Sequence, residues 1–99
     1  MIGTNFFRLL SRKPFKIRIK KLRLLSYTEQ GKVILLDGER LASGAPHQLW
    51  YWFRPNHRWE PPNATVISET EKFRVKKNIE EHFEEKGVSI VVEIMKEKN

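Results

Sequence analysis

The sequence predicts a single α+β domain, in which a small antiparallel β-sheet is packed on one face by one α-helix. Two observations lead to this prediction. Several segments with the apolar patterns of strands precede one long segment with helical periodicity, and a final alternating segment follows it. The chain has 99 residues, about the length of one domain, and 39% of them are hydrophobic, which is enough to form a core.

The positive charge lies in the first part of the chain. Residues 1–27 contain eight basic side chains and no acidic one, while the net charge of the whole chain is +7, so the remainder is close to neutral. Residues 1–14 are predicted to form either a flexible tail or a short helical basic arm, and residues 15–95 the globular body. Such a basic segment either contacts nucleic acid or anionic lipid or is a solvated strand or arm.

The first strand is predicted to begin at Phe15. Apolar residues alternate from Phe15 to Ile19, and the alternation then slips by one position across the next two lysines. The slip predicts either a β-bulge or a break between two strands. The basic residues in between would form a positively charged outer face. The candidate contacts for a polyanion are Arg18, Lys20, Lys21 and Arg23.

Glycines mark the ends of the next segments. Gln30-Gly31 predicts a tight turn, because glycine adopts a positive φ without steric cost. Residues 33–36 are apolar throughout, which favours a buried strand. Asp37-Gly38 predicts either a second turn or a bulge within a longer strand. Residues 42–48 have the composition of a loop.

Residues 49–53, LWYWF, predict a further strand, since aromatic side chains favour sheets. Tyr51 and Phe53 would share one face with Leu49, and Trp50 and Trp52 would lie on the other.

The stretch Trp59-Glu60-Pro61-Pro62 predicts a rigid corner between the sheet and the helix. Pro61 and Pro62 donate no backbone hydrogen bond and therefore end any preceding strand. Trp59 would lie on the core, while Glu60 would cap a turn or pair with an arginine. The alternative is a partner-binding patch on an exposed loop, and the rigidity of the two prolines favours the corner.

A helix is predicted over residues 69–86. Ser68 and Glu71 have the spacing of a capping box at its start. Val75, Ile79 and Phe83 form one apolar stripe, and a glycine follows the last turn. Residues 88–95 then alternate and predict the final strand.

The composition argues against several kinds of protein. There is no cysteine, which excludes disulfides, and no run of about 18 apolar residues that would span a membrane. The start lacks the pattern of a secretory signal, so a cytoplasmic protein is expected.

No catalytic motif is present, and His47 and His57 are interpreted as exposed loop residues around the aromatic strand. We therefore expect no catalytic residue, no metal site and no cofactor.

The order of the motifs resembles a known family. Gly38-Glu39 follows an aliphatic run, and WYWF, WEPP, a Ser-x-x-Glu helix and an aliphatic strand come after it. This order, over about residues 22–94, resembles the immunity protein 74 family of bacterial polymorphic-toxin systems. The resemblance implies a small cytoplasmic protein that neutralises a toxin made by the same cell or its kin. The positions that match the family's characteristic residues are Gly38, Glu39, Trp59, Glu60, Pro61 and Pro62.

Two features depart from that family. The basic segment 1–19 is not expected from the resemblance. Inhibitors of nuclease toxins are typically acidic, whereas this chain carries +7, so its toxin would present an acidic or mixed surface.

The leading hypothesis is a non-catalytic protein that binds a cognate toxin. Tryptophan and arginine dominate binding hot spots, so the candidate contacts are Trp50, Trp52, Arg54, His57 and Arg58. The alternative is a small nucleic-acid-binding module that uses residues 8–23 and the aromatic strand 49–53. Unpaired edges of the small sheet would also allow a homodimer.

Overall fold

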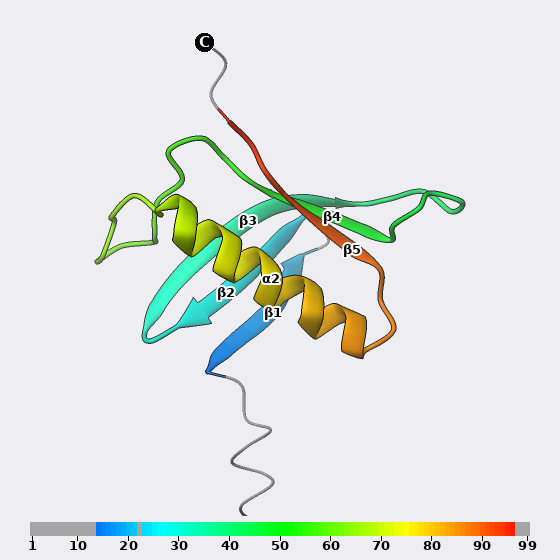
Figure 1. Cartoon of the computed structure of the whole chain (residues 1–99), viewed down its shortest axis with the longest axis horizontal. Helices are drawn as coiled ribbons and strands as arrows, with labels where there is room; N and C mark the ends of the chain where they lie inside the picture. The colour runs from blue at the N-terminus through cyan, green and yellow to red at the C-terminus, as the bar shows by residue number, and fades with distance from the viewer. Residues whose placement is uncertain (1–13, 22, 97–99) are drawn as a thin grey trace, which may run out of the picture.

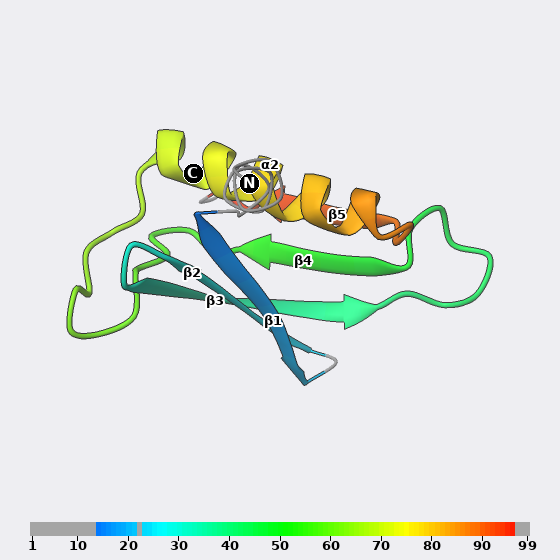
Figure 2. The ribbon, with the colours of Figure 1, turned by 90° about the horizontal axis from the view of Figure 1, so that it is seen from below.

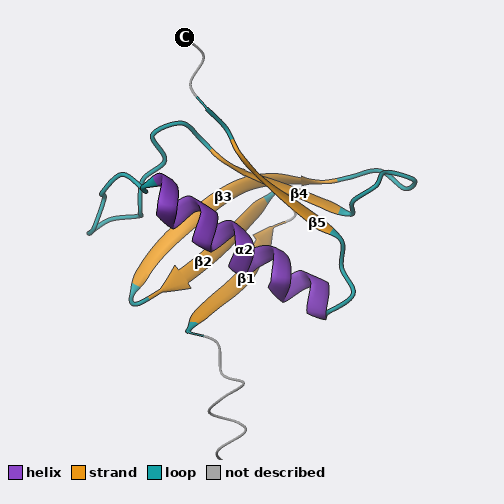
Figure 3. Cartoon of the chain, viewed as in Figure 1, coloured by secondary structure: helices purple, strands orange, loops and turns teal. Residues whose placement is uncertain are grey.

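The computed structural model describes residues 14–21 and 23–96, so the predicted arm lies outside it except for Pro14. Five strands and one helix follow one another along the chain (Figure 3). They are β1 (Phe15–Lys21), β2 (Leu24–Glu29), β3 (Lys32–Arg40), β4 (Leu49–Phe53), α2 (Glu69–Glu85) and β5 (Ile90–Ile94). The predicted α+β fold is confirmed.

The strands form one sheet in the order β1-β2-β3-β4-β5 (Figure 1). The first three pairings are antiparallel, as predicted, but β5 lies parallel to β4. The reason is the connection: α2 carries the chain back along the sheet, so β5 enters in the same direction as β4. The sheet is therefore mixed.

The helix covers one face of this sheet (Figure 2). Its buried stripe consists of Val75, Ile79 and Phe83, as the periodicity predicts, together with Lys72. These apolar residues join the inward side chains of the strands in a single core. The largest side chains of that core are Trp59, Tyr27, Tyr51 and Phe53.

Local signals in the sequence set the ends of α2. The Ser68 hydroxyl accepts a hydrogen bond from the Glu71 backbone N–H (3.1 Å), and the Glu71 carboxylate accepts one from the Ser68 N–H (2.9 Å). This second bond is the main reason that the pKa of Glu71 lies below its ordinary value. At the other end Gly87 has a φ of +75°, the left-handed conformation that ends helices. The predicted capping box is confirmed.

The turns of the first three strands follow the predictions with one exception. β1 contains a register shift between Ile19 and Lys21, and the chain then turns back into β2, so the slip marks both a bulge and the end of a strand. Gln30 and Gly31 both have positive φ, which fits the tight turn. Gly38, however, lies in neither a turn nor a bulge: it is a regular position within β3.

The two edges of the sheet are protected in different ways. On β5 the Lys76 Nζ donates to the Val92 carbonyl (2.7 Å), and the Glu80 carboxylate accepts from the Val92 N–H (3.2 Å). The helix thus occupies backbone groups that another strand would need. The other edge strand, β1, is rich in lysine and arginine, and like charges disfavour pairing between two copies. Neither edge favours the homodimer.

Candidate partner-binding face

The candidate site is the side of the sheet that α2 leaves uncovered, which we call the open face. In Figure 2 the helix lies along one side only, and residues 14–21 and 23–96 place no helix or strand on the other. Tyr51 and Phe53 of β4 are buried toward the core. Because side chains alternate along a strand, Trp50 and Trp52 point to the open face, as predicted.

The two tryptophans form a contiguous aromatic surface. Both are half-buried, and their ring centroids lie 4.8 Å apart with the planes tilted by 52°. The Nε1 donor of Trp50 is buried and has no hydrogen-bond partner in the described part of the chain. A buried donor without a hydrogen-bond partner costs about 1–3 kcal/mol of folding free energy, so such donors are rare in folded proteins.

Carboxylates flank the tryptophan pair on both sides. Glu39 on β3 is the register partner of Trp50, and Glu93 on β5 is a register partner of Trp52. Side chains of register partners point to the same face of a sheet. Asp37 also lies opposite Trp52, where Arg54 pairs with it through Nε and Oδ2 at 3.5 Å.

The basic residues of β1 lie at the other end of the open face. Arg18 is the register partner of Ser26, and Lys21 that of Leu24, and both side chains are exposed. Two strands separate β1 from β4. With about 4.8 Å between neighbouring strands, the basic edge is about 14 Å from the tryptophans. Lys20 and Arg23 are exposed as well. The open face is thus basic along β1 and aromatic and acidic along β3–β5.

The predicted partner contacts do not all reach this face. Arg54 is exposed and joins Asp37 there, whereas Arg58 is exposed but donates from Nη1 to the Ala64 carbonyl (2.8 Å). The bond of Arg58 holds the loop after β4. His57 is only 5% exposed, which corrects the prediction that it lies on an exposed loop and contacts a partner.

The hydrogen bonds of His57 explain its burial. Its Nδ1 accepts from the Arg54 N–H (3.0 Å), so Nε2 carries the proton and donates to the Leu35 carbonyl (2.9 Å). The bond to Leu35 ties the chain after β4 to β3, and the bond from Arg54 holds the turn between residues 54 and 57. Burial lowers the pKa of His57 below its ordinary value of 6.5, mainly because the charged ring would lose its hydration.

This lowered pKa predicts a pH-dependent stability. The unfolded chain binds the proton more readily than the folded one, so the free energy of unfolding should fall as the pH drops below about 6.5. The slope from one group is at most about 1.4 kcal/mol per pH unit. Urea unfolding between pH 7.5 and 5.5 measures it, and His57→Gln should flatten the profile. Equal slopes for both proteins would contradict the assignment.

In the Trp59-Glu60-Pro61-Pro62 corner, the tryptophan has a structural role. Trp59 is 2% exposed, and the Nζ of Lys32 lies 4.4 Å from its ring centroid. Backbone bonds hold the corner: the Glu60 N–H donates to the Val33 carbonyl at 2.8 Å. Pro61 and Pro62, joined by a cis peptide bond, are exposed. The corner therefore bonds to β3 at Val33, buries its tryptophan and exposes its prolines.

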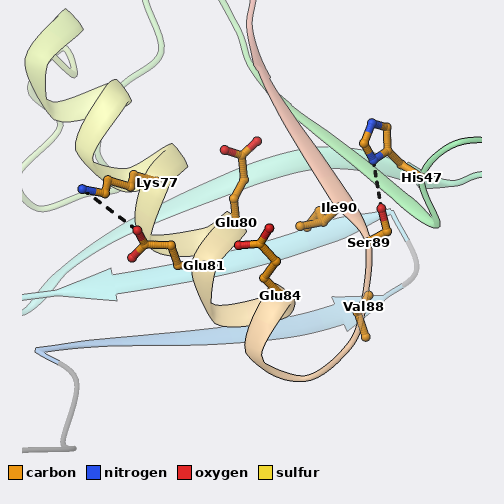
Figure 4. A pocket seen from close by; sticks show the side chains of 8 residues that line it. All are labelled: His47, Lys77, Glu80, Glu81, Glu84, Val88, Ser89 and Ile90. Carbon is orange, nitrogen blue, oxygen red and sulfur yellow. Dashed lines mark hydrogen bonds and ion pairs between the residues drawn. The ribbon is translucent and has the colours of Figure 1, made fainter.

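A cavity of about 400 Å³ lies on the helix side (Figure 4). It is lined by His47, Lys77, Glu80, Glu81, Glu84, Val88, Ser89 and Ile90. Its His47 Nδ1 and Ser89 Oγ are 3.0 Å apart, a distance that suits a nucleophile and its base. Among the described residues, however, no acid bonds the other nitrogen of His47, and Glu80 is engaged with Lys76 and Val92. The cavity lacks the third group of a catalytic triad.

Other kinds of site have no support in residues 14–21 and 23–96. No group of three or more histidine and acidic side chains there is arranged to hold a metal ion. His47 and His57 lie at opposite ends of β4 and have different partners. Within the same residues, no helix has the length and apolar character needed to cross a membrane.

Comparisons with protein-family models, with curated proteins and with solved structures found no match. The resemblance to the immunity protein 74 family therefore stays a prediction.

Two acidic residues of the open face were not predicted from the sequence as part of a site. Asp37 was interpreted as part of a turn or of a bulge within a longer strand, and Glu93 as one position of an alternating strand. The signal was present for Glu93, because it alternates with the buried Val92 and so must point away from the core. Its position beside Trp52 depends on the parallel pairing of β5, which the sequence does not show.

Proposed function

We propose that this protein is a non-catalytic immunity protein that binds a cognate bacterial toxin through the open face and blocks its active site or substrate path. The observation that carries the proposal is the tryptophan pair Trp50–Trp52, which no helix or strand of the described part of the chain covers. Aromatic clusters at the centre of a face are typical binding hot spots. The proposal places the protein in the cytoplasm. The lack of cysteine agrees with this location, because cytosolic proteins rarely depend on disulfides.

A protein partner fits the charges of this face better than nucleic acid does. Single-stranded nucleic acid needs cations beside the aromatic rings on which its bases stack. Here Glu39 and Glu93 flank the rings and would repel phosphates, while the basic strand lies across two further strands. A toxin with a mixed surface, acidic opposite β1 and basic opposite β4, would match the whole face.

The proposal predicts one stoichiometric protein partner. The tagged protein is used for affinity capture from native lysate of its own organism, with and without nuclease and in high salt, and the captured proteins are identified by mass spectrometry. A toxin-like protein that survives both treatments is the expected result. A mixture of nucleic acid and nucleic-acid-bound proteins, lost on nuclease treatment, would contradict it and favour the nucleic-acid-binding module instead.

A further inference from the structure

We propose that the open face receives an arginine side chain of the partner, which lies on the Trp50–Trp52 pair between the carboxylates of Glu39 and Glu93. This inference rests on the proposed function and adds the chemistry of its central contact. It follows from the charges around the rings, from the geometry of the rings and from a parallel contact elsewhere in the same chain.

Among the described residues, the carboxylates beside the tryptophans outnumber the cations that pair with them. Three acidic residues lie beside the pair, and among residues 14–21 and 23–96 one arginine, Arg54, forms an ion pair with one of them, Asp37. Glu39 and Glu93 are exposed and form no ion pair with any described residue. They stand on β3 and β5, on opposite sides of β4, so a cation over the rings would face a carboxylate on each side.

The rings themselves favour a cation. The faces of tryptophan carry negative electrostatic potential and attract a cation placed within about 6 Å of the ring centroid. The two rings are not coplanar: their planes are tilted by 52° and their centroids lie 4.8 Å apart. A guanidinium fits such a place better than an ammonium does, because it is planar, stacks on aromatic faces and is less strongly hydrated.

The chain already forms a contact of this type at another position. The Lys32 Nζ lies 4.4 Å from the centroid of the Trp59 ring, and the same nitrogen is 3.9 Å from the Glu71 carboxylate. A cation between an indole and a carboxylate is thus part of the folded protein on the helix side. On the open face the indoles and the carboxylates are present, and the partner would supply the cation.

The test uses the indole N–H signals of the ¹⁵N-labelled protein, which has three tryptophans. A capped penta-arginine peptide is the probe, and the signals are assigned with Trp50→Phe and Trp52→Phe. The peptide should shift the signals of Trp50 and Trp52 in a saturable way and leave that of the buried Trp59 in place. Penta-lysine should bind more weakly than penta-arginine.

Matched variants separate this contact from a general attraction of charges. Glu39→Gln with Glu93→Gln removes two charges beside the rings and should raise the Kd for penta-arginine by about fivefold. Glu81→Gln with Glu84→Gln removes two charges from the helix and should leave the Kd within about twofold. Equal effects of the two pairs, or equal shifts of all three indoles, would overturn the inference.

The proposed function is tested separately, by measuring how the captured partner binds to the variants. Loss of partner binding on replacing both tryptophans, together with unchanged binding of the Glu39→Gln, Glu93→Gln protein, would refute the arginine contact and leave the proposed function standing. Partner binding that is insensitive to both tryptophans would remove the proposed function, whatever penta-arginine does. Loss of partner binding in both double variants supports both.

Discussion

Replacing Trp59 by alanine should lower the free energy of unfolding by about 3–5 kcal/mol, the range for large aromatic side chains in cores. The ring is 2% exposed and belongs to the same core as the helix and the sheet. Its removal would leave a cavity at the corner where the chain leaves the sheet for α2, and the cation–π contact with Lys32 would be lost. Urea unfolding followed by circular dichroism measures the change.

The matched control for this variant is Phe73→Ala. Phe73 is 58% exposed on α2, so truncating it should change the free energy of unfolding by no more than about 0.5 kcal/mol. Trp59→Phe should fall between the two, because it keeps part of the buried aromatic surface. If Trp59→Ala is no more destabilising than Phe73→Ala, the corner is a surface feature and the structural interpretation fails.

Gly38→Ala should destabilise the fold by about 3 kcal/mol, at the upper end for inserting one carbon into a packed site. A Cβ at this position would lie 2.1 Å from Cδ1 of Tyr51 and 2.6 Å from the Trp50 carbonyl oxygen. Tyr51 is fully buried, so its ring has little room to move away. The glycine is therefore explained by the close approach of a neighbouring side chain.

Gly31→Ala provides the comparison for a glycine with another role. Gly31 has a φ of +76°, and a Cβ at this position would have no atom within 4 Å, so alanine there meets only backbone strain, about 1 kcal/mol. Thermal unfolding of the two variants under the same conditions gives the difference. A Gly38→Ala protein as stable as Gly31→Ala would show that Tyr51 adjusts without cost.

The elements of the fold were predictable because they depend on local signals. The start of α2 follows from Ser68 and Glu71, its end from Gly87, and the turn at Gln30-Gly31 from the backbone preference of glycine. The parallel pairing of β5 was not predictable from the alternation of its residues, because a strand looks the same in either direction. Gly38 was misinterpreted because its cause, the ring of Tyr51, lies on another strand.

The candidate site was only partly predictable for the same reason. Alternation placed Trp50 and Trp52 on one face, but their surroundings depend on which strands lie on either side of β4. The error about His57 has a similar origin. A histidine between polar residues after a strand is typical of an exposed loop. The burial of His57 depends instead on its hydrogen bond to the Leu35 carbonyl of β3, which is distant in sequence.

The most direct test of the account is the affinity of the captured partner for three proteins, measured by calorimetry. These are the unaltered protein, Trp50→Thr with Trp52→Thr, and Phe73→Ser as a control that removes an exposed aromatic ring outside the open face. Threonine keeps the preference for a strand, and cooperative thermal unfolding of each variant shows that it is folded.

If the open face binds the partner, the tryptophan variant should bind at least about 100-fold more weakly, as expected for the loss of hot-spot residues, and Phe73→Ser should bind within about twofold of the unaltered protein. A folded tryptophan variant with unchanged affinity would contradict the central claim that this protein acts through the uncovered face of its sheet.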